Sequence, residues 1–135
     1  MEINAYKVKD KDVLQRSQYR IIRFVPDCMA GERINIGVVV RDCETGQLTA
    51  RFITNRRRLV AFAPDNHRAA TGFIATCARA LTAADRGESC AIYAYQTIWA
   101  HRNETHDLFE FSDVEKSAQP AEPLLCRLAA HYLRE

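Results

Sequence analysis

The chain has 135 residues, of which 47% are hydrophobic, so it can bury one core but is too short for two domains of ordinary size. Its formal net charge of +2 is too small to indicate a nucleic-acid partner by itself. No apolar run approaches the roughly 20 residues that a membrane helix needs, and the first residues lack the basic start and apolar centre of a signal peptide. We therefore expect a cytoplasmic protein.

The N-terminal stretch, residues 1–17, is a candidate arm or edge strand. A weakly alternating piece is followed by alternating charges at 9–12, which are typical of a solvated segment. We expect residues 18–135 to form a single domain.

Three strands are predicted next, over residues 19–25, 34–41 and 48–54. The first two runs are dense in β-branched residues, and turn residues at 42–47 join the second run to the third. Together they predict an antiparallel β-β-β meander. Gly37 lies inside the second strand, where a missing side chain indicates a bulge or a close approach by a neighbouring element.

Helices are predicted in three places. Asn55 is a favourable N-cap for a short helix over 56–62, and a longer helix starts at about 64 and ends at Gly87. A terminal helix over 121–133 has one apolar stripe, made of Leu124, Leu125, Leu128, Ala129 and Tyr132.

The remaining segments are harder to assign. Residues 108–111 are expected to form a further short strand, and 113–119 a linker. Residues 89–101 favour a strand by propensity, but their apolar residues also fit one helical stripe. The predicted fold class is α+β: a single domain with an antiparallel sheet of three to four strands, beginning with the meander, and about three helices covering one face.

The cysteines are five in number and scattered, and no two form a C-x-x-C pair. This pattern supports neither a disulfide framework nor a zinc knuckle. We expect all of them to be reduced thiols: Cys28, Cys43, Cys77, Cys90 and Cys126.

The region of the first two strands also resembles a known pattern. Residues 19–27 read Y-R-I-I-R-F-V-P-D, and residues 31–40 read G-E-R-I-N-I-G-V-V-V. They resemble the Y-x-I-I-R-[YF]-V-P-D and G-E-x-x-N-I-G-V-V-V patterns of a bacterial family, domain of unknown function 3037. Members are often encoded beside HipA-type kinases of toxin-antitoxin systems, so the resemblance implies a partner rather than an activity. It also favours a helix over 89–101.

One candidate binding patch consists of Arg56, Arg57 and Arg58. These cations follow the predicted N-cap, at the helix end whose dipole already carries partial positive charge. Guanidinium groups beside exposed N–H groups suit a phosphate, a nucleic-acid backbone or an acidic protein surface. The alternative is that the arginines splay into water or pair with a carboxylate such as Asp42 or Glu44.

A second candidate is the loop over 26–33, which is longer than a strand pair needs and coincides with the family pattern. Its alternative role is structural, through an Asx-turn, a positive φ or an ion pair between Glu32 and Arg23 or Arg33. The candidate recognition residues are Asp27, Gly31, Glu32, Arg33 and Asn35.

The sequence contains no phosphate-binding loop, dinucleotide-binding motif, zinc-protease motif or nucleophile elbow. The cluster 101–107 holds two histidines and two carboxylates, but its spacing matches no established ligand pattern. We therefore expect no catalytic residue, no metal and no cofactor.

These observations favour a non-enzymatic accessory protein that binds a protein partner, with a HipA-type kinase as the enzyme it binds or regulates. One alternative is a nucleic-acid-associated protein that uses the arginine cluster. The other is a phosphate-handling or nucleolytic enzyme whose site the sequence does not reveal.

Overall fold

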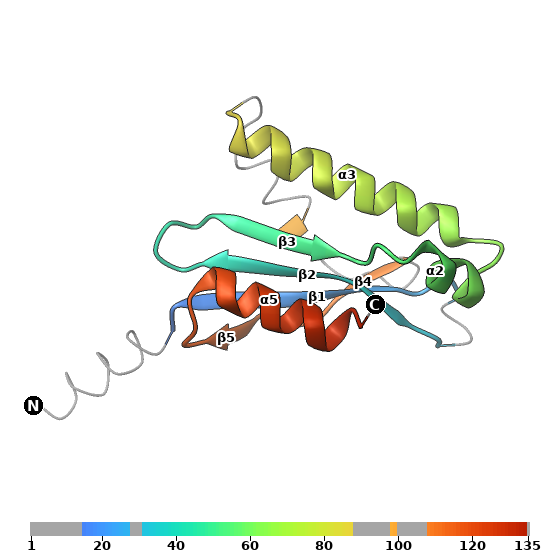
Figure 1. Ribbon diagram of the computed structural model, residues 1–135, viewed down its shortest axis with the longest axis horizontal. Helices are drawn as coiled ribbons and strands as arrows, with labels where there is room; N and C mark the ends of the chain where they lie inside the picture. The colour runs from blue at the N-terminus through green and yellow to red at the C-terminus, as the bar shows by residue number, and fades with distance from the viewer. Residues whose placement is uncertain (1–14, 28–30, 88–97, 100–107, 135) are drawn as a thin grey trace, which may run out of the picture.

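A computed structural model describes residues 15–27, 31–87, 98–99 and 108–134, and Figure 1 shows how the chain is arranged. Of the N-terminal arm, only its end falls within these residues, and most of the ambiguous segment 89–101 and all of the cluster 101–107 lie outside them. No helix in the described part is long and apolar enough to cross a membrane.

The sheet begins with the predicted meander. It consists of β1 (Ser17–Phe24), β2 (Ile34–Asp42) and β3 (Leu48–Phe52), paired antiparallel in the order β3-β2-β1. The turn between β2 and β3 is closed by a hydrogen bond from Gly46 N to Asp42 O at 2.7 Å, and Gly46 has a φ of +75°. A positive φ suits glycine, so the turn forms where the sequence predicts it.

Two short strands complete the other edge. β4 (Phe109–Phe111) pairs with one half of β1 and β5 (Glu115–Ser117) with the other, both antiparallel. The prediction of a strand at 108–111 is confirmed, whereas the prediction of a linker over 113–119 is wrong where β5 lies. Its Glu-Lys-Ser sequence has no apolar alternation, so only its pairing with Ser17–Tyr19 reveals it as a strand.

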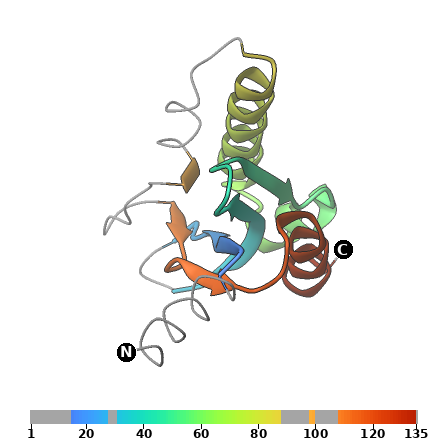
Figure 2. The same cartoon turned by 90° about the vertical axis from the view of Figure 1, so that its left-hand side faces the viewer.

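The helices are α2 (Arg56–Phe62), α3 (His67–Asp85) and α5 (Ala121–Tyr132). The expectation that they cover one face of the sheet is wrong, because α3 packs on one face and α5 on the other (Figure 2). The apolar runs of β1 and β2 explain this arrangement, since strands that are buried on both faces read as nearly continuous hydrophobic stretches.

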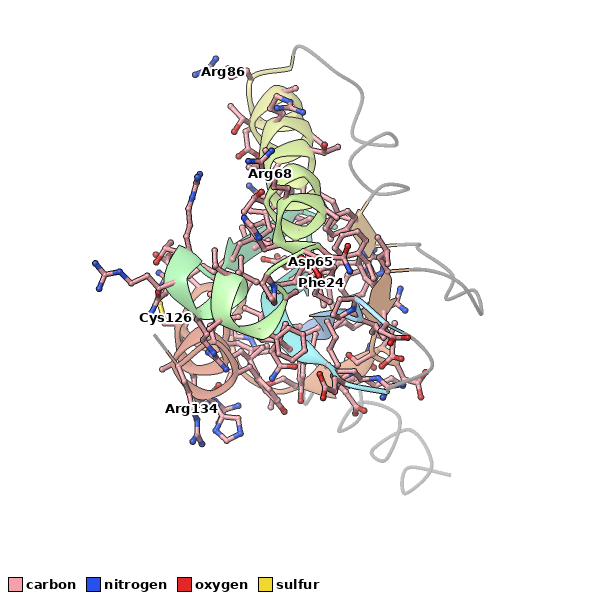
Figure 3. All side chains as sticks on the ribbon, turned by 90° about the vertical axis from the view of Figure 1, so that its right-hand side faces the viewer. Phe24, Asp65, Arg68, Arg86, Cys126 and Arg134 are labelled. Carbon is pink, nitrogen blue, oxygen red and sulfur yellow. The ribbon has the colours of Figure 1, made fainter. Side chains whose placement is uncertain are left out.

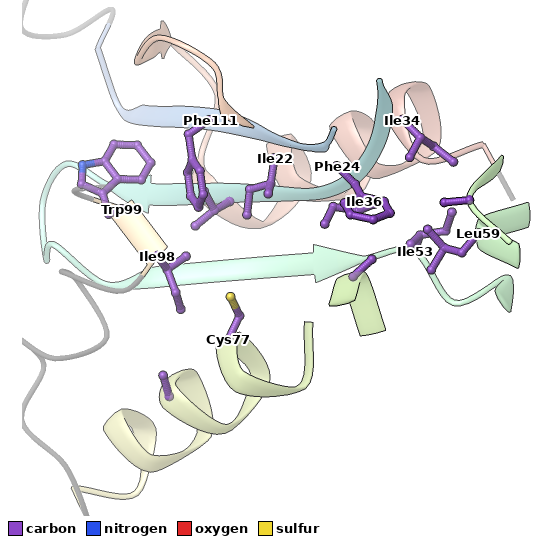
Figure 4. Close-up of a cluster of buried hydrophobic side chains, with 14 residues drawn as sticks. Ile22, Phe24, Ile34, Ile36, Ile53, Leu59, Cys77, Ile98, Trp99 and Phe111 are labelled. Carbon is purple, nitrogen blue, oxygen red and sulfur yellow. The ribbon is translucent and has the colours of Figure 1, made fainter. Parts of the chain in front are cut away.

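The core is split by the sheet into two clusters. The larger one, on the α3 face, includes Phe24, Ile36, Cys77 and Trp99 (Figure 4). The ring of Phe73 stacks on that of Phe109 with centroids 4.0 Å apart. The smaller cluster, on the α5 face, consists of Ile21, Val38, Val40, Leu124, Leu125 and Leu128, so the predicted stripe of the terminal helix is confirmed.

A bulge in β2 determines which side chains face α5. The register of β1 and β2 changes from Ile22 opposite Gly37 to Arg23 opposite Asn35, so Ile36 is the extra residue. The bulge lets Asn35 share the α5 face with Val38, although the two positions differ by an odd number. A Cβ atom on Gly37 would lie 2.7 Å from the Phe52 ring, so both roles predicted for this glycine are confirmed.

Candidate functional site

The C-terminal end of α5 brings together two residues that the sequence analysis assigned to separate sites. Asn35 Nδ2, at the start of β2, donates to Tyr132 O at 3.3 Å. Arg58 Nη1, in α2, donates to Leu133 O at 2.6 Å and to Arg134 O at 3.3 Å. The last carbonyls of a helix have no partner within the helix, so these two side chains satisfy groups that would otherwise need water.

The arginine cluster therefore divides into two parts. Asn55 caps α2 as predicted, with Oδ1 accepting from Arg58 N at 3.3 Å. The Arg58 side chain is half-buried against α5 and bonds carbonyl oxygens rather than Asp42 or Glu44. Arg56 and Arg57 are exposed. Only these two arginines of the cluster are left to face a partner, and anion binding by them stays a prediction.

An ion pair with β4 holds the end of the candidate recognition loop. Arg33 Nε lies 3.1 Å and 3.2 Å from the two carboxylate oxygens of Glu110, and Arg33 Nη1 donates to Gly31 O. Arg23 Nη1 approaches the same carboxylate at 3.5 Å. The partner of both arginines is thus Glu110 on β4, while Glu32 is exposed.

The remaining loop geometry agrees with a turn. Gly31 has a φ of +73°, and its N–H donates to Asp27 O at 3.2 Å. Asp27 is exposed and Cys28 lies outside the described residues. The turn and the Glu110 ion pairs support a positioning role for this loop, in which it fixes the start of β2 and hence Asn35.

Sequence reasoning missed Glu110. The residue lies between two aromatics in a predicted strand, which indicates that its side chain faces away from theirs. Its pairing with Arg23 depends on the register of β4 against β1, where the two residues are direct partners. That register is a tertiary property and leaves no local signal.

Arg20 is a second residue that the sequence analysis did not single out. It is buried in β1, where its Nε donates to Ser112 O at 2.7 Å, its Nη1 donates to Trp99 O, and its guanidinium lies over the Phe111 ring. Burial lowers the pKa of Arg20, while the charge of Asp113 acts in the opposite direction. These hydrogen bonds connect Trp99 and Ser112 to β1, so the role of Arg20 is structural.

A groove runs between β3 and the C-terminal half of α5. It encloses about 510 Å³ and is lined by Arg51, Phe52, Thr54, Ala129, Ala130, Leu133 and Arg134. We call it the α5–β3 groove. Two arginines and, among the described residues, no carboxylate line it, and α2 with its exposed Arg56 and Arg57 begins just after Thr54. Arg134 lies on the opposite side of the molecule from Arg68 of α3 and from Arg86, the C-cap residue of that helix (Figure 3).

The thiols of the described residues have different surroundings. Cys43, Cys77 and Cys126 are free, with Cys77 buried and Cys126 exposed. Burial raises the pKa of Cys77 from 9.0 to about 11, so its thiolate is scarce at neutral pH. Cys43 lines a cavity of about 550 Å³ beside the start of α5, where Gln15 is its polar neighbour at 3.9 Å.

Tyr19 lies on the α5 face beside the smaller cluster. Burial raises its pKa, and the neighbouring Tyr132 and Glu115 raise it further against the opposing charge of Arg127. Its phenol therefore stays protonated and uncharged at neutral pH. In the described residues, no group of three or more His, Cys, Asp or Glu side chains could hold a metal ion.

Comparison with models of known families identifies the family of this chain. The family model described as protein of unknown function (DUF3037) matches residues 19–110, which is more than half of the chain. The chain belongs to the DUF3037 family. No curated protein and no solved structure matches it.

The DUF3037 match has a structural consequence for the site. It starts in β1 and ends in β4, so it includes Asn35 and Arg58 but not α5, whose end these residues hold. Two polar residues of the pattern lie on the α5 face: Tyr19 packs against the smaller cluster, and Asn35 donates to Tyr132 O.

Proposed function

We propose that this chain is a non-enzymatic cytoplasmic accessory protein that binds a partner protein through the α5–β3 groove and the adjacent Arg56 and Arg57. The chain resembles a family whose members are often encoded beside HipA-type kinases, and this makes such a kinase the first partner to test. In this proposal the chain binds or regulates that enzyme.

The observation that carries the proposal is the unequal use of the arginines. Arg23 and Arg33 are paired with Glu110, and Arg58 is bonded to carbonyls of the α5 end. By contrast, Arg56 and Arg57 are exposed, and among the described residues no carboxylate lies within ion-pair distance of either. Among the described residues, Arg68 and Arg79 on α3 are also exposed without a carboxylate in ion-pair distance. Arg56 and Arg57 differ because they follow directly after the groove that Arg51 and Arg134 line, and such a concentration of guanidinium groups favours an acidic partner surface.

The same arrangement favours recognition over catalysis. The charged groups of the groove are Arg51 and Arg134, and a guanidinium offers only hydrogen-bond donors and no acceptor. A guanidinium instead orients carboxylates and phosphates through its planar set of donors. Because a guanidinium also binds the phosphates of a nucleic-acid backbone, nucleic acid is the second candidate partner.

The test is affinity capture from the native host at near-physiological salt. We expect a kinase-type partner to co-purify with the unmodified chain and to be lost with Arg56→Gln/Arg57→Gln. The matched control is Arg68→Gln/Arg79→Gln, which removes the same charge from exposed positions on α3. Recovery of the bait alone, or equal loss with both double variants, would contradict the proposal.

Nucleic acid is distinguished by salt dependence. If Arg56 and Arg57 contact duplex phosphates, the slope of log affinity against log salt flattens by roughly 2 in the double variant, at about 0.9 per phosphate. A partner-protein surface predicts no measurable DNA or RNA binding at about 150 mM salt.

A further inference from the structure

The outer edge of β3 carries backbone groups without a described partner. Ile53 N donates to Ile36 O at 2.8 Å, and Asp42 N donates to Gln47 O at 2.9 Å, so residues 47 and 53 point their groups at β2. By the alternation of an antiparallel ladder, Leu48, Ala50 and Phe52 point theirs away from β2. In the described part of the chain, β2 is the one strand that pairs with β3.

This edge lies beside the α5–β3 groove. Arg51 and Phe52 of β3 and the following Thr54 line one wall of the groove, and α5 supplies the opposite wall. Figure 2 shows β3 at the end of the sheet, between α3 and α5. A strand added to β3 would therefore place alternate side chains in the groove and the others toward α3.

The groove wall indicates which side chains would fit. Ala129 and Ala130 are small and leave room, while Arg51 and Arg134 supply positive charge. Thr49 Oγ1, whose side chain is on the same face as Arg51, is buried without a hydrogen-bond partner among the described residues. A second copy of this chain is a poor occupant, because pairing of two β3 edges would bring two sets of arginines together.

We infer that the partner of the function proposed above binds by β-strand addition, with an extended acidic segment pairing along the outer edge of β3. The segment spans about five residues, which is the length of β3. Its acidic side chains face the arginines of the groove, and its backbone pairs with Leu48, Ala50 and Phe52. This inference rests on the proposed function for the identity of the partner. Its test does not, because a synthetic peptide takes the place of the partner.

The test uses a synthetic probe with the full chain. The probe is a terminally blocked octapeptide of alternating Glu and Val. One control peptide replaces Glu by Lys, and another carries N-methyl groups on alternate residues, which removes backbone donors on one edge. We expect the Glu–Val peptide to slow amide exchange at Leu48, Ala50 and Phe52. The Lys–Val peptide and one of the two N-methyl registers should bind at least about tenfold more weakly.

A variant tests the strand directly. Ala50→Pro removes an N–H that points outward, so it leaves the pairing with β2 in place and blocks an added strand. Arg51→Glu should weaken binding of the Glu–Val peptide and strengthen binding of the Lys–Val peptide, whereas Arg68→Glu on α3 should do neither. If Ala50→Pro does not fold, the N-methyl comparison on the unmodified chain decides the question.

The inference and the proposed function fail in different ways. Equal binding of both N-methyl registers and the unmodified peptide, exchange protection elsewhere, or no binding of the Glu–Val peptide would overturn strand addition. Loss of the native partner on Arg56→Gln/Arg57→Gln but not on Ala50→Pro would also overturn it while leaving the proposed function intact. Peptide binding at β3 without any captured partner would support strand addition and contradict the proposed accessory role.

Discussion

On the α3 face, the sheet packs against a large apolar cluster in which the ring of Phe109 stacks between those of Phe24 and Phe73. On the α5 face, a smaller apolar stripe is supplemented by polar bonds from Asn35 and Arg58 to the end of the helix. Both faces combine burial with side-chain hydrogen bonds, but they use the bonds differently. Those of Arg20 join Trp99 and Ser112 on the α3 face, whereas those of Asn35 and Arg58 hold the end of a helix.

Under the function proposed above, this difference would separate the part of the molecule that provides stability from the part that binds a partner. The α3 face provides most of the buried apolar contact, whereas the groove with its two arginines lies on the α5 side, beside the edge strand β3. Regions with fewer buried contacts open more readily, and binding surfaces are often drawn from them. The predictions below test whether the two faces differ in this way.

The largest effect is expected for Phe24→Ala on the α3 face. Phe24 is fully buried and stacks on Phe109, so its truncation should lower the free energy of unfolding by about 3–5 kcal/mol. Urea denaturation monitored by circular dichroism measures this loss. A loss below about 1 kcal/mol would show that this cluster does not dominate stability.

Leu124→Ala makes the matching change on the α5 face. Leu124 is also fully buried, but its cluster is smaller, so we expect a loss near the lower end of the range of about 2–5 kcal/mol. In this variant, amide hydrogen exchange should become faster in α5 by a larger factor than in β1 and β2. Uniform acceleration over the whole chain would mean that α5 does not open separately.

A smaller loss is expected for Arg58→Gln. The half-buried guanidinium bonds two carbonyls at the α5 end, so its removal should cost about 1 kcal/mol and increase exchange in the last turn of α5. Arg57→Gln is the matched control, and we expect its effect to stay within about ±0.5 kcal/mol. Equal effects of the two substitutions would remove the structural role of Arg58.

The thiols give the smallest effect at neutral pH. All five cysteines should be alkylated under non-reducing, denaturing conditions, whereas in the folded chain Cys77 should react far more slowly than Cys126. Intact-mass measurement checks both.

The buried thiol of Cys77 also makes stability depend on pH. Because the folded pKa of Cys77 is raised to about 11, its contribution to the free energy of unfolding is complete below pH 9 and is lost as the pH rises from 9 through 11. Cys77→Ala should lack this decline.

Local patterns predicted much of this fold. The meander, the N-cap at Asn55 and the stripe of α5 were accessible because each depends on residues close together in sequence. The bulge at Ile36 was signalled by Gly37 alone. The strand β5 and the placement of helices on both faces were missed, since both depend on which distant segments pack together.

The candidate site was predicted only in part. The sequence shows the charge cluster at residues 56–58. That the Arg58 side chain bonds the end of α5 depends on where that helix packs. The convergence of Asn35 on the same helix end also requires the bulge. The groove between β3 and α5 joins segments roughly 75 positions apart, as the contact of Arg51 with Cys126 shows, and no local pattern reports that.

The most direct test is hydrogen exchange of the full chain with and without the proposed partner, beginning with a HipA-type kinase. We predict that binding protects β3 and the C-terminal half of α5 from exchange and leaves exchange in α3 unchanged. Protection confined to α3, or to the edge formed by β4 and β5, would contradict the assignment of recognition to the α5 side of the sheet.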